Sequence, residues 1–337
     1  MVSDTTNNTG TNINTSYSLQ AVISKISTNA PVLTTGGTTT YTGTTYYATA
    51  KNGSGNPAGT IYYGTSAGST SYSLTASTTA ANMTSMGRAN VGTTTIYAFF
   101  RPTDTSHYSD SAGATTTVTI SNKATGSSGS ISNPAAQTYK ASGTYSYQLG
   151  ISGATGTVTY PTSITVKNSG GTTISGWSCT SAGVVTVPQG TNAGSYTVTG
   201  NITVATSTNY NAVSATSKTW TITINKANTN APVLTAGTKT TYDGNYVYAT
   251  AKTGSGNPAG TIYYGASSGS TSYSIAASTT AANLTSMGRR DVGTTTIYAF
   301  FRPTDTTNYN DSSGATTTVS VTNKATGSSG NVSNPAA

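Results

Sequence analysis

Acidic residues, cysteine and histidine are nearly absent from this chain of 337 residues. It contains seven acidic residues, all of them aspartate, together with one histidine and one cysteine. The lone Cys179 excludes an internal disulfide and a cysteine metal cluster, so cysteine usage does not indicate the redox compartment. Charged side chains make up only 7% of the sequence, a share that is not typical of a soluble cytosolic enzyme.

Long apolar runs are also missing. No stretch approaches the roughly 20 apolar residues that a membrane-spanning helix needs. The first residues, MVSDTTNNTGTNINTS, show no charged region, no apolar core and no cleavage site, so we expect no secretory signal within this sequence. That expectation favours a virion component over an exported one.

Basic residues are spread thinly along the chain. The formal net charge of +8 comes from 15 lysines and arginines, most of which stand alone. The one adjacent pair in a repeated position, Arg289-Arg290, reads Arg88-Ala89 in the first copy. A nucleic-acid interface needs a basic stripe with interleaved aromatic residues. The sequence therefore predicts no nucleic-acid partner.

An internal repeat dominates what is present. The fifteen residues VGTTTIYAFFRPTDT occur at 91–105 and again at 292–306. The match extends over 28–136 and 229–337 at a constant offset of about 200 positions, without insertion or deletion. The chain is therefore built from duplicated domains.

The repeat divides the chain into units that close on similar strands. In TWTITINKA, Trp220, Ile222 and Ile224 fall on one face and threonines on the other, which is the period-two pattern of a half-buried strand. We place domains at 28–124, 125–227 and 228–325. The first and third are called type A and the second type B, and 326–337 starts a further type B unit after a polar segment at 1–27.

Each unit predicts an all-β domain. Six or seven short runs rich in Thr, Tyr, Val and Ile alternate with Gly, Asn, Pro and Ser clusters, and no helical periodicity occurs. This spacing favours an all-β fold, either an antiparallel sandwich or a barrel. In TIYAFF, Ile96, Ala98 and Phe100 share one face while Tyr97 and Phe99 share the other, so we predict a central strand.

These residues resemble a known family. The pattern NAGSYTV…NYN…TWTITINKA, with TYDGN at 241–245, is similar to the bacterial immunoglobulin-like repeats of surface and adhesin proteins, and related modules decorate virions of tailed phages. The resemblance covers nearly all of 28–325. It implies tandem Ig-like sandwiches and no particular ligand. The first copy reads TYTGT at 40–44, which argues against Asp243 as an ion ligand.

Candidate catalytic side chains are few. His107 is replaced by Asn308 in the other type A unit, so an imidazole is missing from one copy, and we interpret His107 as a polar turn residue. Cys179 has no histidine nearby in sequence to activate it, so we interpret it as a buried strand residue. We predict no catalytic residue and no cofactor.

Two aspartates recur in both type A units: Asp104 and Asp110, repeated as Asp305 and Asp311. Calcium sites use six to eight oxygen ligands with several carboxylates, which this chain can hardly supply. We expect Asp104 to cap its own turn instead, and predict no metal site.

Tyrosine pairs occur at Tyr46-Tyr47, Tyr62-Tyr63 and Tyr263-Tyr264. Adjacent residues of a strand point to opposite faces, so at least one ring of each pair should lie outside the core. Such a ring either stacks on a sugar or another protein, or packs across strands on a Thr-rich surface. We favour cross-strand packing.

Two classes of function fit these features. The first is a non-enzymatic structural or adhesive stalk on a bacterial cell surface or a phage virion, with surface glycans, proteins or neighbouring subunits as partners. The second is a set of accessory domains of a larger secreted enzyme. Short junctions such as NKANTNAPVL at 225–234 predict an extended array, in which three domains reach roughly 100–120 Å.

The N-terminal segment contains a repeat fragment. Residues 21–33 match 222–234, so 18–26 has the sequence of a closing strand whose domain body is absent. This strand either docks on another subunit, as a donor strand does, or is a remnant of a longer array folded against the first type A unit. We favour the remnant.

Overall fold

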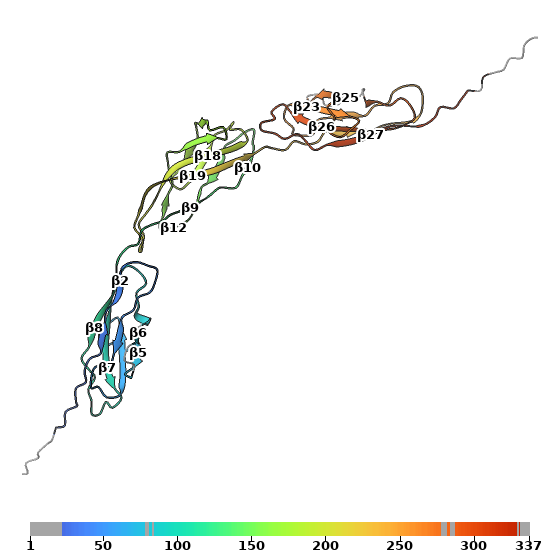
Figure 1. Cartoon of the computed structure of the whole chain (residues 1–337). Helices are drawn as coiled ribbons and strands as arrows, with labels where there is room; N and C mark the ends of the chain where they lie inside the picture. Colours follow the sequence, from blue (N-terminus) through green and yellow to red (C-terminus); the bar gives the residue numbers. More distant parts are fainter. Residues whose placement is uncertain are drawn as a thin grey trace, which may run out of the picture. The chain divides into compact units, whose positions relative to one another are not determined.

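The chain forms three β-sandwiches, shown in the computed structural model of Figure 1. The structure describes residues 22–77, 81–82, 84–277, 282–283, 287–328 and 330. Two compact units are formed: Met1–Thr125 with Ser207–Asn211, and Gly126–Thr206 with Ala212–Ala337. In the described part of the chain, no helix is long and apolar enough to cross a membrane.

The first sandwich falls within the predicted range 28–124. Its larger sheet has the order β2-β8-β7-β4-β5, and its smaller sheet the order β1-β3-β6. A short 3₁₀ helix, η1 (Thr84–Met86), precedes β7. The strands are β1 (Val32–Thr34), β2 (Gly36–Thr40), β3 (Thr49–Lys51), β4 (Gly59–Gly64), β5 (Tyr72–Thr75), β6 (Ala81–Asn82), β7 (Gly92–Pro102) and β8 (Ala114–Asn122).

The second sandwich falls within 125–227 and is arranged differently. Its main sheet has the order β10-β19-β18-β14-β15, with β13 also paired to β18, and smaller sheets join β11-β17-β16 and β12-β9. The strands are β9 (Ser128–Ser132), β10 (Gln137–Thr138), β11 (Tyr145–Gln148), β12 (Gly150–Ala154), β13 (Val158–Thr159), β14 (Thr165–Asn168), β15 (Thr173–Ile174), β16 (Ser178–Cys179), β17 (Val184–Val187), β18 (Gly194–Val204) and β19 (Val213–Asn225).

The third sandwich, within 228–325, repeats the first. Its sheets have the orders β21-β27-β26-β23-β24 and β20-β22-β25. The strands are β20 (Val233–Thr235), β21 (Gly237–Thr241), β22 (Thr250–Lys252), β23 (Gly260–Gly265), β24 (Tyr273–Ala276), β25 (Ala282–Asn283), β26 (Gly293–Pro303) and β27 (Ala315–Asn323).

The predicted inward faces form the cores. Strand β7 lies between β8 and β4, which confirms that it is central, and Phe100 and Ile96 are fully buried. In β19, Trp220 and Ile222 are fully buried, and the Trp220 indole N–H donates to the carbonyl of Gly150 at 3.0 Å. Alternation along single strands therefore identified the buried residues. The fold is all-β, with tandem Ig-like sandwiches as expected.

In each sandwich the strand near the entrance pairs in parallel with the strand at the exit. Strand β2 pairs with β8, β10 with β19, and β21 with β27. The other pairings within the sandwiches are antiparallel, for example β7 with β8 and β4 with β7 (Figure 1). The last strand of each sandwich is thus hydrogen-bonded to its second strand, whereas the first strands β1, β9 and β20 pair antiparallel with β3, β12 and β22.

The predicted lone strand at 18–26 is only partly described, because residues 18–21 lie outside the described residues. Residues 22–25 form no strand, and Val22 and Ile23 are 84% and 92% exposed. Ile26 makes an isolated parallel bridge to Tyr108 of the first sandwich. For 326–337, only 326–328 and 330 are described, and they are exposed.

Candidate functional site

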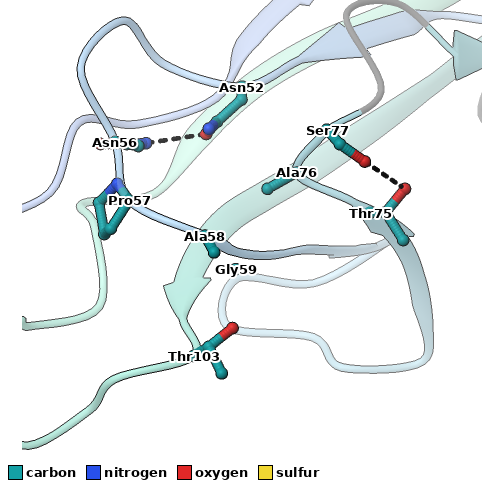
Figure 2. A pocket seen from close by; sticks show the side chains of 9 residues that line it. All are labelled: Asn52, Asn56, Pro57, Ala58, Gly59, Thr75, Ala76, Ser77 and Thr103. Atoms are coloured by element: carbon teal, nitrogen blue, oxygen red, sulfur yellow. Dashed lines mark hydrogen bonds between the residues drawn. The ribbon is translucent and has the colours of Figure 1, made fainter.

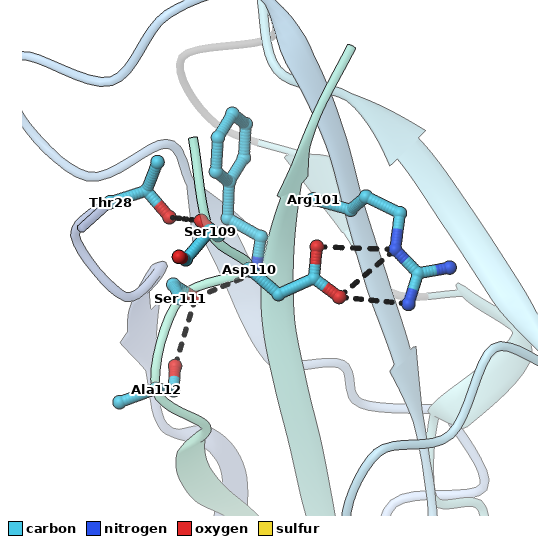
Figure 3. Close-up of polar contacts among 7 residues, drawn as sticks. Thr28, Arg101, Ser109, Asp110, Ser111 and Ala112 are labelled. Carbon is cyan, nitrogen blue, oxygen red and sulfur yellow. Dashed lines mark hydrogen bonds and ion pairs between the residues drawn. The ribbon is translucent and has the colours of Figure 1, made fainter. Parts of the chain in front are cut away.

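The outer face of the first sandwich carries an arginine stacked on two aromatic rings. Tyr62 of β4 lies opposite Phe99 of β7, and their rings stack with centroids 5.6 Å apart. The Arg101 guanidinium lies over both rings, with Cζ 5.3 Å from each centroid. Its Nε and Nη2 donate to the Asp110 carboxylate at 2.8–3.2 Å (Figure 3). Hydrogen bonding to Asp110 raises the pKa of Arg101 above its ordinary value.

The third sandwich repeats this arrangement with Tyr263, Phe300, Arg302 and Asp311. In both sandwiches the two rings stack across neighbouring strands with the guanidinium close to both, which is cross-strand packing. Tyr63 and Tyr264 point into the cores and are buried. The prediction that one ring of each of these pairs lies outside the core is confirmed.

Asp104 organises the turn that contains His107. Its Oδ1 accepts hydrogen bonds from the backbone N–H groups of Ser106 and His107, and its Oδ2 lies 2.7 Å from His107 Nδ1. Bonds from Ser106 and then His107 hold the pKa of Asp104 well below its usual range. The predicted turn cap is confirmed, and His107 is an exposed turn residue.

The two repeated aspartates have separate partners. Asp104 is engaged by its turn, whereas Asp110 is engaged by Arg101. Asp305 and Asp311 repeat this division. Among the described residues, no group of three or more His, Cys, Asp or Glu side chains lies close enough to hold a metal ion. The structure therefore does not bring this candidate calcium pair together in one ligand set.

Asp243 belongs to an exposed turn of the third sandwich. Lys239 Nζ donates to its Oδ1 at 2.7 Å, and the Asn245 N–H donates at 2.9 Å. The Lys239 bond, with that of Asn245, lowers the pKa of Asp243 to about 2. The first sandwich has Thr42 at this position, so the arrangement is not shared by both copies.

Cys179 lies in β16 and is 6% exposed, packed in the core of the second sandwich. Burial raises the pKa of its thiol. A thiol in such surroundings is a poor nucleophile, because only the thiolate reacts. The interpretation of Cys179 as a buried strand residue is confirmed.

A cleft of about 430 Å³ opens between loops of the first sandwich (Figure 2). Asn56 Nδ2 donates to Asn52 Oδ1 at 2.9 Å on one side, and Ser77 and Thr75 lie on the other. The third sandwich has a counterpart of about 350 Å³, in which Thr253 replaces Asn52. The side chains lining both clefts are neutral, so they offer hydrogen bonds but no charged acid or base.

The most elaborate polar contact is made by a docking turn, Ser207–Asn211, which belongs to the compact unit of the first sandwich. Asn209 Oδ1 accepts from the backbone N–H of Val91 at 3.0 Å, and its Nδ2 donates to Asn90 Oδ1 at 2.8 Å. The Tyr210 ring meets Tyr41 edge to face at 5.3 Å. The first sandwich therefore binds the turn through the N–H of Val91, the side-chain oxygen of Asn90 and the ring of Tyr41.

The linker before the second sandwich fixes the same turn. Lys123 Nζ donates to the carbonyl of Ser207 at 2.6 Å. The N–H of Ala124 donates to the carbonyl of Asn209 at 2.8 Å, and the N–H of Asn211 donates to the carbonyl of Ala124 at 2.9 Å. These bonds hold the turn to the linker backbone on its other side.

A second docking turn, Thr306–Asn310, repeats the contact within the other compact unit. Asn308 Oδ1 accepts from Ala193 N–H at 2.7 Å, and Nδ2 donates to Asn192 Oδ1 at 3.0 Å. Tyr309 meets Tyr139 edge to face at 5.4 Å. Asn308 is 4% exposed and also donates to Asp305 Oδ2, so its buried amide is fully hydrogen-bonded.

Sequence reasoning missed this site. Type A and type B units share Asn90 and Asn192, Gly92 and Gly194, and Tyr108 and Tyr210 at identical spacing, and two of these residues, Asn90 and Tyr210, take part in the first contact. Their repetition in both unit types was the available signal. Asn209 is 118 residues from Val91 and 119 residues from Asn90 in the sequence. Alternation within single strands does not predict a contact between loops so far apart.

Comparisons with known proteins give no family. No family model matches the chain, and no curated protein matches it. Solved structures similar to it include Drosophila N-cadherin EC1-4 (14% identity, 88% of this chain, 74% of that one, TM-score 0.22). The chicken CNTN1 FN1-FN3 domains are also similar (9% identity, 86% of this chain, 100% of that one, TM-score 0.24). So are three N-terminal domains of the bacteriophage RB49 Hoc protein (11% identity, 87% of this chain, 99% of that one, TM-score 0.23). At these scores the similarities carry no argument about function.

Proposed function

We propose that this chain is a non-enzymatic structural or adhesive stalk of tandem Ig-like domains that bears mechanical load. The observation that carries the proposal is the parallel pairing of entrance and exit strands in all three sandwiches. Each first strand, β1, β9 or β20, pairs antiparallel with another strand and must give way first. Pulling a domain by its two ends then moves its parallel second and last strands in opposite directions along their own length. All the hydrogen bonds between them are then loaded together, in shear.

Shear loading suits a spacer because all the hydrogen bonds between the two parallel strands must break at the same time, which requires a higher force than breaking them one by one. In β2 and β8 the register runs from Gly36 opposite Val118 to Thr40 opposite Asn122. The N–H of Tyr41 adds a bond to the carbonyl of Asn122 at 2.9 Å. The second sandwich has a shorter row, with Gln137 and Thr138 as the paired residues of β10. Its terminal pair should therefore resist less force.

The site chemistry fits the same role. Arg101 is paired with Asp110 and Arg302 with Asp311, and the docking turns are held to the linkers by repeated bonds. We place the stalk on a bacterial cell surface or a phage virion, with neighbouring subunits, surface proteins or glycans as its partners. Binding by several weak sites along one array would raise avidity about a hundredfold or more.

Single-molecule force spectroscopy on the full chain, held by its ends, tests the load-bearing role. We expect three separate unfolding events, each releasing roughly 350 Å of chain because about a hundred residues extend at about 3.5 Å each. One event should occur at lower force, that of the second sandwich. Unfolding without a resolved force peak would contradict the proposal.

The matched variants Tyr41→Pro and Tyr41→Phe sharpen the test. Proline removes the backbone N–H that bonds to Asn122, whereas phenylalanine keeps it. We expect the proline variant to lower the force of one of the two stronger events and the phenylalanine variant to leave all three unchanged. Equal effects of both variants would show that the bond from the Tyr41 N–H to Asn122 does not carry the load.

Labelling tests the location. An antibody raised against the folded chain should label intact cells or intact virions of the source without permeabilisation. Labelling that appears only after lysis would contradict display on either surface.

A further inference from the structure

The third sandwich carries the parts that receive a docking turn in the other two. On the first sandwich these parts are the receiving loop Asn90–Gly92 and Tyr41, and on the second they are the receiving loop Asn192–Gly194 and Tyr139. The third sandwich has the equivalent loop Asp291–Gly293 and the equivalent ring of Tyr242. The docking turns Ser207–Asn211 and Thr306–Asn310 are both already seated elsewhere.

The receiving loop of the third sandwich is held in the same way as that of the first. Arg88 Nη2 donates to the carbonyl of Val91 at 2.7 Å, and Arg289 Nη2 donates to that of Val292 at 2.9 Å. A Cβ on Gly293 would lie 2.2 Å from Arg289 Nη2, and φ at this glycine is 133°, so only glycine admits the clamp. The receiving loop Asp291–Gly293 is thus held in place by Arg289, without needing a bound docking turn.

The tyrosine is also positioned alike in the three sandwiches. The N–H of Tyr41 donates to Asn122, that of Tyr139 to Asn225 and that of Tyr242 to Asn323, each over 2.8–2.9 Å. Lys324 and Ala325 follow Asn323 as Lys123 and Ala124 follow Asn122. The lysine and alanine that hold a docking turn from the linker side are therefore present as well.

One substitution makes the third receiving loop a stronger acceptor. Asp291 stands where Asn90 and Asn192 accept a hydrogen bond from the amide of a docking turn. A carboxylate accepts such a bond more strongly than an amide oxygen does. The Asp291 side chain is 72% exposed and lies 3.5 Å from Arg290 Nε, so it is accessible to a partner.

We propose that Tyr242, Asp291 and Val292 form a docking site for the Asn-Tyr turn of another type B sandwich. Its asparagine would accept from the N–H of Val292 and donate to the Asp291 carboxylate, and its tyrosine would meet Tyr242 edge to face. The sequence at 326–337 agrees with this occupant, because it repeats 125–136 at all but two positions.

The turn of the first sandwich does not fit this site. His107 takes the place of Asn209 and Asn308, and its Nδ1 is already held by Asp104 at 2.7 Å. The remaining ring nitrogen either accepts or donates a hydrogen bond, whereas asparagine does both at once. Head-to-tail docking of a second copy through this turn is therefore disfavoured.

The test uses the full chain extended by a second copy of residues 137–227 after Ala337, which completes a type B unit on 326–337. Hydrogen exchange followed by mass spectrometry reports on the loop MGRRDVG, which differs from MGRANVG of the first sandwich. We expect exchange of the Val292 N–H to slow at least tenfold in the extended chain. Exchange of the Val91 N–H, whose site is already filled, should not change.

The matched control carries Asn209→Ala in the appended copy alone. In this variant the Val292 N–H should exchange as fast as it does in the unextended chain. Unchanged exchange in the extended chain, or equal protection with and without the asparagine, would overturn the proposal. An appended unit that stays unfolded, with its tryptophans exposed, would also overturn the proposal. The second sandwich, which has the same sequence over 137–227, folds with its docking turn seated in a receiving loop of the same kind. Dimers of the unextended chain in light scattering would show that the His107 turn is the occupant and overturn the assignment.

Discussion

Phe100→Ala should destabilise the first sandwich by about 3–5 kcal/mol while leaving the other two unchanged. The ring is fully buried in the central strand β7, and transferring such a side chain out of water is worth up to about 3 kcal/mol. The cavity left behind adds to this loss. Small neighbours such as Ala48 and Ala50 carry only a methyl group, which cannot rotate into the space. The backbone of Gly59 lies directly against the ring, since a Cβ there would come within 2.4 Å of Cζ.

The assay is hydrogen exchange on the full chain. Strands β7 and β26 have identical sequences, so their peptides cannot be distinguished, but β8 and β27 differ after their first five residues. A loss of 3–5 kcal/mol accelerates exchange that requires domain unfolding by about 10²–10⁴-fold. We expect this acceleration in β8 and not in β27, and the reverse in Phe301→Ala.

Tryptophan fluorescence supplies an internal control. Trp177 and Trp220 are the two tryptophans of the chain, and both belong to the core of the second sandwich. The urea transition followed by their emission should be the same in Phe100→Ala as in the wild type. Unchanged exchange of β8 in the variant would refute the assignment of Phe100 to the core, and a shifted tryptophan transition would refute the independence of the sandwiches.

Three further predictions concern other residues. Cys179 should react with a thiol reagent only after urea unfolds the second sandwich, because burial raises its pKa and hides it; rapid reaction of the native chain would contradict this. The Asp243 carboxyl should titrate in NMR with a midpoint of about 2, and Lys239→Ala should raise that midpoint. Because the pKa is lowered in the folded state, the stabilisation is present above the unfolded value of about 3.9 and is lost as pH falls toward 2; an unshifted midpoint would refute the contact. Asn209→Ala should accelerate exchange of the Val91 N–H and spare that of Ala193, and equal effects at both would show that the two contacts are not separate.

Much of the fold could be predicted from the sequence, because apolar and polar residues alternate along a half-buried strand and so identify its buried face. The alternation of Trp220, Ile222 and Ile224 with threonines was sufficient to identify the core side of β19. The two apolar faces of TIYAFF identified β7 as central, although Phe99 is covered by Tyr62 and Arg101 and not by a second sheet.

The polar contacts could not be predicted in the same way. Arg101 and Asp110 are nine residues apart on a strand and a following loop, and their pairing depends on the path of that loop. The docking turns depend on which distant loops meet. The Asn-Tyr pair recurs at Asn209-Tyr210 and Asn308-Tyr309, but a repeated pair alone does not show which distant loop it contacts.

The proposed stalk requires the extended array that the sequence predicts, and small-angle X-ray scattering of the full chain tests this expectation most directly. Three domains of this kind should reach roughly 100–120 Å, and a uniform rod of that length has a radius of gyration of about 32 Å. A single compact globule of this chain length would have a radius of gyration of about 20 Å. A value at or above about 30 Å, with the chain monomeric in light scattering, is the predicted result. A value near 20 Å would contradict the account.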